Sequence, residues 1–187
     1  MLTAIAKEYG NGRLLFIGST DLDTQQPVIW NVGAIAASGH PRALDTIRRL
    51  LLASAAIPAA FPPMMFDVTV DGKAYQEMDV DGGAFVQTFL YPASVTVQRR
   101  TRMANDQPVP AAAAYIIRNG RLDPEWATVQ RRTLDIAGRA ISTMIAASGY
   151  NDILHIYNTT QKDSVDFNLA YIGPNFNMDL PAPFDPS

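Results

Sequence analysis

The sequence predicts an α/β domain with a mixed β-sheet flanked by helices. Short apolar runs bounded by turn residues, which are typical of strands, alternate with segments whose apolar residues recur at helical spacing. Two of the runs, 64–70 and 73–80, are joined by Asp71-Gly72, a strong hairpin turn. A hairpin pairs its strands antiparallel, whereas strands linked through helices favour parallel pairing, so the sheet is expected to be mixed.

The first half of the chain is expected to alternate closely between helices and strands. Leu44, Ile47 and Leu51 recur at helical spacing, and Pro41 favours the first position of a helix. The expected elements are a helix at 2–9, strands at 13–20 and 28–32, a short helical turn at 33–39, a helix at about 41–55, and the hairpin strands at 64–70 and 73–80.

The second half contains the strongest helix pattern. Asp123 is expected to cap this helix, Pro124 to take its first position, Glu125 to complement its dipole and Gly149 to end it. Its apolar face between 134 and 145 is predicted to be core. The other expected elements are strands at 94–100, 111–118 and 152–158, a loop at 103–110, and a surface loop at 173–187.

Composition excludes several function classes. The 187 residues are 48% apolar and 18% charged, which argues against disorder and against a membrane bundle. A net charge of -3 provides no global basic field for nucleic acid. The chain has no cysteine, and His40 and His155 lack a metal-type partner at helical spacing, so neither a metal nor a cofactor is expected. The N-terminus does not resemble a secretory signal; the compartment is left open, with the cytoplasm as default and peripheral membrane contact as an option.

Two stretches stand out as a candidate site. The first, 53–63, closes a helix with small residues and continues into Ile-Pro and Phe-Pro-Pro corners; the second is Asp81-Gly82-Gly83, at the end of a predicted strand. A lone Asp-Gly-Gly turn is usually structural, because Asp caps turns and glycines supply positive φ. Here Asp81 ends a strand of an α/β domain, where ligand sites gather, and an apolar corner lies near it in sequence. These features make Asp81 a candidate general base.

Five segments stand in a characteristic order: 12–23, 30–39, 52–58, 61–63 and 81–83. Together they resemble the second half of patatin-like phospholipases, and the likeness extends from about Leu2 to the tail near Asp185. In that family a Ser–Asp dyad without histidine hydrolyses acyl esters of lipids. The resemblance implies that Asp81 is the dyad aspartate, supported by Gly82 and Gly83, and that the residues after the helix line an acyl pocket. The expected pocket residues are Phe61, Pro62, Pro63 and Met64.

The sequence departs from the family in one large respect. It contains neither the glycine-rich oxyanion loop nor the Gly-x-Ser-x-Gly elbow that exposes a nucleophilic serine. Ser54, near Asp81 in the motif, is expected to pack at a helix end rather than to react. The chain is therefore expected to be a single partial domain over 1–187 that supplies the dyad aspartate but not the serine, and to be inactive alone. Whether it belongs to an enzyme is left open, because a non-catalytic lipid- or partner-binding remnant, or an elbow supplied by a partner chain, also fits.

The expected partners follow from this hypothesis. They are an acyl lipid at a membrane or micelle surface, no nucleic acid, and a second copy of the chain that pairs through apolar surface left open by truncation. Arg99, Arg100 and Arg102 form either a patch for anionic lipid headgroups or, more simply, a solvated strand end. Asp21 and Asp23 form a turn that could also brace the rim of the pocket.

Overall fold

A computed structural model of the 187 residues describes 1–58, 60–91, 93–124 and 126–176. The chain forms two compact units, Met1–Thr88 and Phe89–Ser187. The predicted helix-opening residue Glu125 and most of the predicted surface loop, 177–187, lie outside the described residues. That the whole chain, 1–187, forms a single patatin-like domain stays a prediction, and the division into two compact units does not test it.

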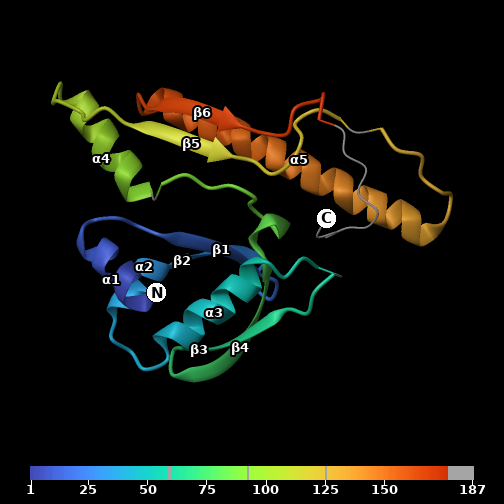
Figure 1. Ribbon diagram of the computed structural model, residues 1–187, viewed down its shortest axis with the longest axis horizontal. Helices are drawn as coiled ribbons and strands as arrows, with labels where there is room; N and C mark the ends of the chain where they lie inside the picture. Colours follow the sequence, from blue (N-terminus) through green and yellow to red (C-terminus); the bar gives the residue numbers. More distant parts are fainter. Residues whose placement is uncertain (59, 92, 125, 177–187) are drawn as a thin grey trace. The chain divides into compact units, whose positions relative to one another are not determined.

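The first unit is built on a four-stranded antiparallel sheet with the order β2-β1-β4-β3 (Figure 1). The turn Asp71-Gly72 joins β3 to β4, and both residues have positive φ, 51° and 77°, as a tight hairpin turn requires. The predictions for this half of the chain are confirmed to within a few residues. The elements are α1 (Leu2–Gly10), β1 (Phe16–Asp21), β2 (Gln26–Asn31), α2 (Val32–Ala37), α3 (Ala43–Ser54), β3 (Met64–Val70), β4 (Lys73–Asp81) and the 3-10 helix η1 (Gly82–Ala84).

Helix α3 supplies the core of this unit. Its Leu50 and Ala53 are completely buried against Phe66 of β3, and Trp30 and Met64 pack around them. The rings of Trp30 and Phe66 lie 5.4 Å apart between centroids. Burial of one side chain of the size of Leu50 stabilises the fold by about 2 kcal/mol. A second cluster joins the helices α1, α2 and α3 through Val32, Ala36 and Ile47, with Leu2 and Ile5 against them.

The second unit is a parallel two-stranded sheet with a helical crossover. Strands β5 (Ala113–Ile117) and β6 (Asp166–Ala170) pair in parallel, and the helix α5 (Thr133–Lys162) connects them. Ala114 and Ile116 of β5 pack on Ile153 and Ile156 of α5. Helix α4 (Ala93–Ala104) precedes this crossover. The structure is therefore α/β, as predicted, with the antiparallel and parallel pairings in two separate sheets rather than in one mixed sheet.

Two predicted strands of this unit are wrong. Residues 94–100 lie in α4, because consecutive Arg99 and Arg100 both reach the end of α5, whereas a strand would point them to opposite sides. Residues 152–158 lie in α5, where Ile153, Ile156 and Thr160 follow the 3.6-residue period and face the sheet. The predicted helix from 123 is also wrong at both ends, since α5 begins at Thr133 and continues through the buried Gly149. Strand β6 was not predicted.

The prediction that the apolar face between 134 and 145 is core is also wrong. Leu134, Ile141 and Met144 are 85%, 58% and 71% exposed. Tyr115 and Ile117, on the face of β5 turned away from α5, are 78% and 85% exposed, although parallel strands are usually covered on both faces. No helix of the described residues is both long enough and apolar enough to cross a bilayer.

Candidate functional site

Asp81 is the last residue of β4 and is half-buried. Its carboxylate Oδ1 accepts a hydrogen bond of 2.7 Å from the backbone N–H of Gly83 and so caps η1. Its own backbone N–H donates to the carbonyl of Ala56 at 3.0 Å. The two stretches singled out in the sequence, 53–63 and 81–83, are thus joined directly, and the position of the carboxylate is fixed from both sides.

The glycines of this turn are needed for a different reason from the one predicted. Gly82 and Gly83 do not have positive φ, so that part of the interpretation is wrong. Instead, a Cβ on Gly82 would lie 2.8 Å from the carbonyl oxygen of Gly18 on β1, closer than such atoms can approach. Thr20 donates to the carbonyl of Gly82 at 3.3 Å, which holds the turn against the same strand. The glycine therefore permits close contact between the turn and β1.

The serine directly opposite Asp81 across the sheet is Ser19 of β1. Ser19 is only 1% exposed, and its hydroxyl oxygen accepts a hydrogen bond of 2.8 Å from the indole N–H of Trp30. It lies within a regular strand rather than on a strained strand-to-helix turn, so it lacks the geometry of an exposed nucleophile. Ser54 is the last residue of α3, two residues before the carbonyl of Ala56 that binds Asp81.

Sequence reasoning missed a second carboxylate, Asp79. Met64, directly opposite it on β3, packs on Leu50 and Ala53, so Asp79 lies on the sheet face that α3 covers. Asp79 is completely buried, and neither of its oxygens accepts a hydrogen bond of normal geometry from the described residues. The i, i+2 spacing of the acids at 77, 79 and 81 was the available signal, because alternate residues of a strand share a face.

The surroundings of Asp79 favour its neutral form. Burial first, and then the nearby carboxylates of Asp21 and Glu77, raise the pKa of Asp79 to about 6, while the hydroxyl of Ser19 partly offsets this rise. Asp21 is directly opposite Asp79 on β1. A carboxyl group of this kind changes charge close to neutral pH.

Asp21 and Asp23 form the predicted turn and also hold β4. Oδ1 of Asp21 accepts from the backbone N–H of Asp23 at 2.9 Å, and its Oδ2 accepts from the hydroxyl of Thr24 at 2.5 Å. Oδ2 of Asp23 accepts from the backbone N–H of Met78 at 2.9 Å. These bonds fix the start of the β1–β2 turn beside the strand that carries Asp79 and Asp81.

The residues expected to line an acyl pocket have two different environments. Phe61, Pro62 and Pro63 are exposed on the segment that leads into β3, with Phe61 46% exposed. Met64 is half-buried and packs against the core under α3. Met64 pairs directly with Asp79, two residues before Asp81 on β4, so the start of β3 lies beside the site. The acyl-pocket assignment stays a prediction.

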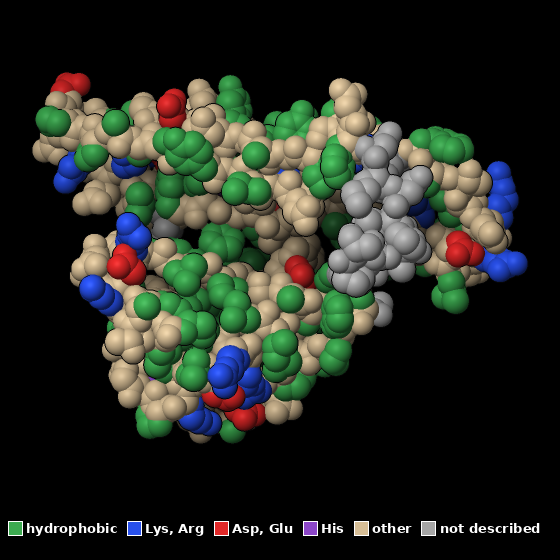
Figure 2. All heavy atoms as spheres, viewed as in Figure 1, with side chains coloured by type: hydrophobic (Ala, Val, Ile, Leu, Met, Phe, Trp, Pro, Cys, Tyr) green, Lys and Arg blue, Asp and Glu red, His purple; other side chains and the backbone are tan. Residues whose placement is uncertain are grey.

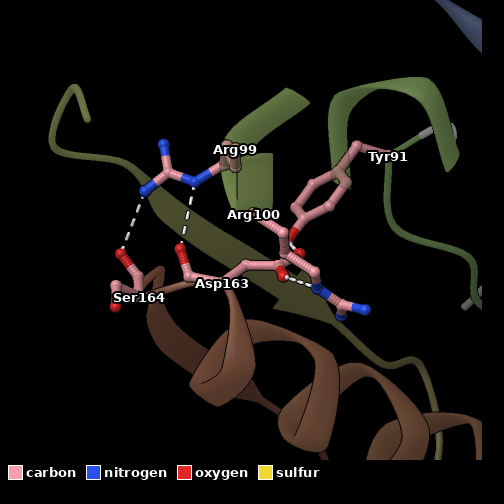
Figure 3. Close-up of polar contacts among 5 residues, drawn as sticks. All are labelled: Tyr91, Arg99, Arg100, Asp163 and Ser164. Carbon is pink, nitrogen blue, oxygen red and sulfur yellow. Dashed lines mark hydrogen bonds and ion pairs between the residues drawn. The ribbon is translucent and has the colours of Figure 1, made fainter. Parts of the chain in front are cut away.

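Arg99 and Arg100 form a network inside the second unit (Figure 3). Nε of Arg100 donates to Oδ1 of Asp163, and the hydroxyl of Tyr91 donates to Oδ2, both at 2.6 Å. Arg99 donates to the backbone carbonyls of Asp163, Ser164 and Pro110 at 3.0, 3.1 and 2.9 Å. These two arginines therefore hold the end of α5, and the prediction of a solvated strand end is wrong.

This network sets the charge state of Asp163, which is completely buried. Burial raises its pKa, but the hydrogen bonds from Tyr91 and Arg100 outweigh this effect and hold the pKa of Asp163 below its usual range. Burial and the bond to Asp163 together raise the pKa of Tyr91 to about 12. The carboxylate is thus kept ionised and the phenol neutral.

The chemistry available at Asp81 is that of a positioned base. A carboxylate held at a strand end can accept a proton from a hydroxyl brought within about 3 Å. Across the described residues no group of three His, Cys, Asp or Glu side chains is arranged to hold a metal ion. No protein-family model, curated protein or solved structure matches the chain.

Proposed function

We propose that the chain is the C-terminal portion of a patatin-like serine lipid acyl hydrolase. In this proposal Asp81 is the aspartate of the Ser–Asp dyad, and the serine and its oxyanion loop come from residues that this chain does not contain. The substrate is an acyl lipid at a membrane or micelle surface. A second copy of the chain, pairing through exposed apolar surface such as the outer face of β5, is part of the same proposal.

The observation that supports this proposal is the double anchoring of Asp81. Its backbone N–H is tied to Ala56 and its carboxylate to the N–H of Gly83, while the close approach of Gly82 to β1 prevents the turn from shifting. A catalytic base needs such restraint because its proton transfer depends on the distance to the hydroxyl.

The expected mechanism is covalent. Asp81 accepts the proton of the serine hydroxyl as the serine oxygen attacks the ester carbonyl, and the alcohol leaves with a proton returned by Asp81. Water then cleaves the acyl-serine, with Asp81 again acting as base. Ser19 does not serve as this nucleophile because it is buried and its oxygen is bound by Trp30.

The test joins this chain to a preceding segment of a patatin-like hydrolase that carries a Gly-x-Ser-x-Gly elbow, and measures hydrolysis of p-nitrophenyl butyrate. The chain alone is expected to be inactive and the joined protein active. Asp81→Asn should lower kcat of the joined protein by about 10³-fold, because the amide cannot accept the proton. The matched control is Asp67→Asn on β3, an exposed carboxylate whose loss should leave kcat unchanged.

Two outcomes separate the alternatives. Burst kinetics from the chain alone that vanish on Asp81→Asn would show that the serine is in this chain and would contradict the proposal. A joined protein that folds and binds lipid but has the same negligible activity with Asp81 or Asn at this position would favour the non-catalytic remnant.

A further inference from the structure

The first half of α5 and the loop before it form an exposed apolar surface, here named the α5 overhang and defined as residues 126–144. Trp126, Leu134 and Met144 are 87%, 85% and 71% exposed. The second half of the same helix is different, because Ile153 and Ile156 are buried against the sheet. The helix therefore continues for several turns past the strands that it covers. The large apolar side chains on this part of the helix are left exposed.

Three large apolar side chains of the overhang lie on one side of the helix, whereas Ile136, which is 53% exposed, lies two residues after Leu134 and therefore on the opposite side. Leu134, Ile141 and Met144 are separated by seven and three residues, spacings that return to the same face. Contiguous apolar surface of this kind marks a site of interaction with a protein or a membrane. The charges around it distinguish between these two kinds of partner.

The overhang is basic in an acidic protein. It contains three arginines and one aspartate, whereas the whole chain has a net charge of -3. Arg131 and Arg132 are exposed immediately before the first turn of α5, and the ion pairs found in the described residues involve neither of them. Figure 2 shows basic, hydrophobic and acidic side chains together at the end of the second unit where α5 begins.

The combination of arginine, exposed tryptophan and an apolar helix face matches an anionic membrane surface. Arginine side chains are attracted to anionic headgroups, tryptophan is favoured at the boundary between headgroups and acyl chains, and an apolar helix face enters that boundary. A protein partner would be favoured by the apolar face alone, whereas the two exposed arginines beside that face favour an anionic surface.

We propose that the α5 overhang is a membrane-docking surface selective for anionic lipid. Arg131 and Arg132 contact the headgroups, and Trp126, Leu134 and Met144 enter the interface. The proposal extends the lipid substrate proposed above to the way in which the protein reaches it. The test below measures membrane binding alone. The docking proposal can therefore fail while the hydrolase proposal stands, and the hydrolase proposal can fail while the docking proposal stands.

The experiment is co-flotation of the full chain, first purified as a non-aggregated fraction, with vesicles of phosphatidylcholine alone or with about one third phosphatidylserine. Binding is expected only to the anionic vesicles, with a blue shift of tryptophan emission that is absent in Trp126→Phe. Arg131→Gln/Arg132→Gln should lower the partition coefficient by roughly 30-fold, since each charge near the surface contributes about fivefold. Leu134→Ser/Met144→Ser should lower it as well.

Control variants carry changes of the same kind in the first unit, on α3 and at Arg42, the residue immediately before it. Arg42→Gln/Arg48→Gln removes two charges, and Leu52→Ser removes an apolar side chain that is 60% exposed. Neither should reduce flotation. Equal binding to both kinds of vesicle, no binding to either, or equal loss in the control variants would overturn the proposal. Self-association that disappears in Leu134→Ser/Met144→Ser without any vesicle binding would overturn it too, and would assign the surface to a second copy of the chain.

Discussion

Among the described residues, Asp79 of the first unit and Asp163 of the second are both completely buried, but their surroundings are opposite. Asp163 at the end of α5 receives hydrogen bonds from Tyr91 and Arg100, and its pKa is lowered. Asp79 in β4 lies among other carboxylates, the hydroxyl of Ser19 offsets their effect only in part, and the pKa of Asp79 is raised to about 6. Burial is common to both, so the difference comes from the partners.

This difference indicates different roles. A buried carboxylate with a cationic partner and a phenol donor ties distant segments together, here α4, the end of α5 and the segment containing Tyr91. A buried carboxylate without a donor destabilises the fold whenever it is ionised. Asp163 therefore stabilises its unit, whereas Asp79 costs stability at neutral pH and lies two residues from the proposed catalytic Asp81.

The largest expected effect is the loss of Asp163. Asp163→Ala should lower the free energy of unfolding by about 3 kcal/mol, because the variant leaves the hydroxyl of the half-buried Tyr91 and the guanidinium of Arg100 without their acceptor. Arg100 is about half exposed, so water can solvate its guanidinium in the variant. The expected loss of stability is therefore at the lower end of the range for breaking a buried ion pair. Urea unfolding at pH 7 measures the change. The control is Asp166→Ala in β6, an exposed aspartate three residues further on, which should change stability little.

The second largest effect is expected at Asp79, where a substitution should stabilise the fold rather than destabilise it. Asp79→Asn should raise the free energy of unfolding at pH 8 by about 2 kcal/mol, because the neutral amide removes a buried charge that lies beside other carboxylates and has no cationic partner among the described residues. Urea unfolding of the variant and the wild type at pH 8 gives the difference. Equal or lower stability of the variant at pH 8 would contradict the prediction, because it would show that Asp79 does not carry a destabilising charge in the folded protein.

The same variant should change the pH dependence of stability. The folded-state pKa of Asp79, about 6, lies above that of an unfolded aspartate, about 3.9, so the folded state binds the proton more tightly. The stabilisation of the fold that protonated Asp79 provides is therefore fully present below about pH 4 and is lost as the pH rises through 6. For Asp163, whose pKa is lowered, stability is present above about pH 4 and is lost as the pH falls through its folded pKa. The fall in the free energy of unfolding as the pH rises from 4 to 7 should be absent in Asp79→Asn and retained in Asp163→Ala.

The fold of the first unit could be predicted because its local signals agree with its tertiary structure. Asp71-Gly72 specifies a tight turn whatever surrounds it, and Leu44, Ile47 and Leu51 repeat at helical spacing on a helix that does pack on a sheet. In the second unit local and tertiary preferences conflict. Val95, Thr96 and Val97 favour a strand by propensity, yet they lie in α4, whose arginines bind the end of α5.

The candidate site shows the same division. Asp81 could be found because its turn is a contiguous motif. Asp79 could not be distinguished from a surface acid, because its burial depends on pairing with Asp21 and on the cover of α3, both distant in sequence. The bond between Arg100 and Asp163 joins residues 63 positions apart and leaves no local pattern.

The smallest expected effect separates the two partners of Asp163. Tyr91→Phe removes one hydrogen bond but leaves the ion pair with Arg100 and most of the ring packing, so the free energy of unfolding should fall by about 1 kcal/mol. Urea unfolding against the wild type measures it, with Tyr75→Phe on the exposed surface of β4 as the control. Because the phenol also lowers the pKa of Asp163, the variant should lose stability at a higher pH than the wild type on acidification. An unchanged acid midpoint would mean that Arg99 and Arg100 keep Asp163 ionised without the phenol, and that the contrast with Asp79 comes from the cations rather than from the Tyr91 hydroxyl.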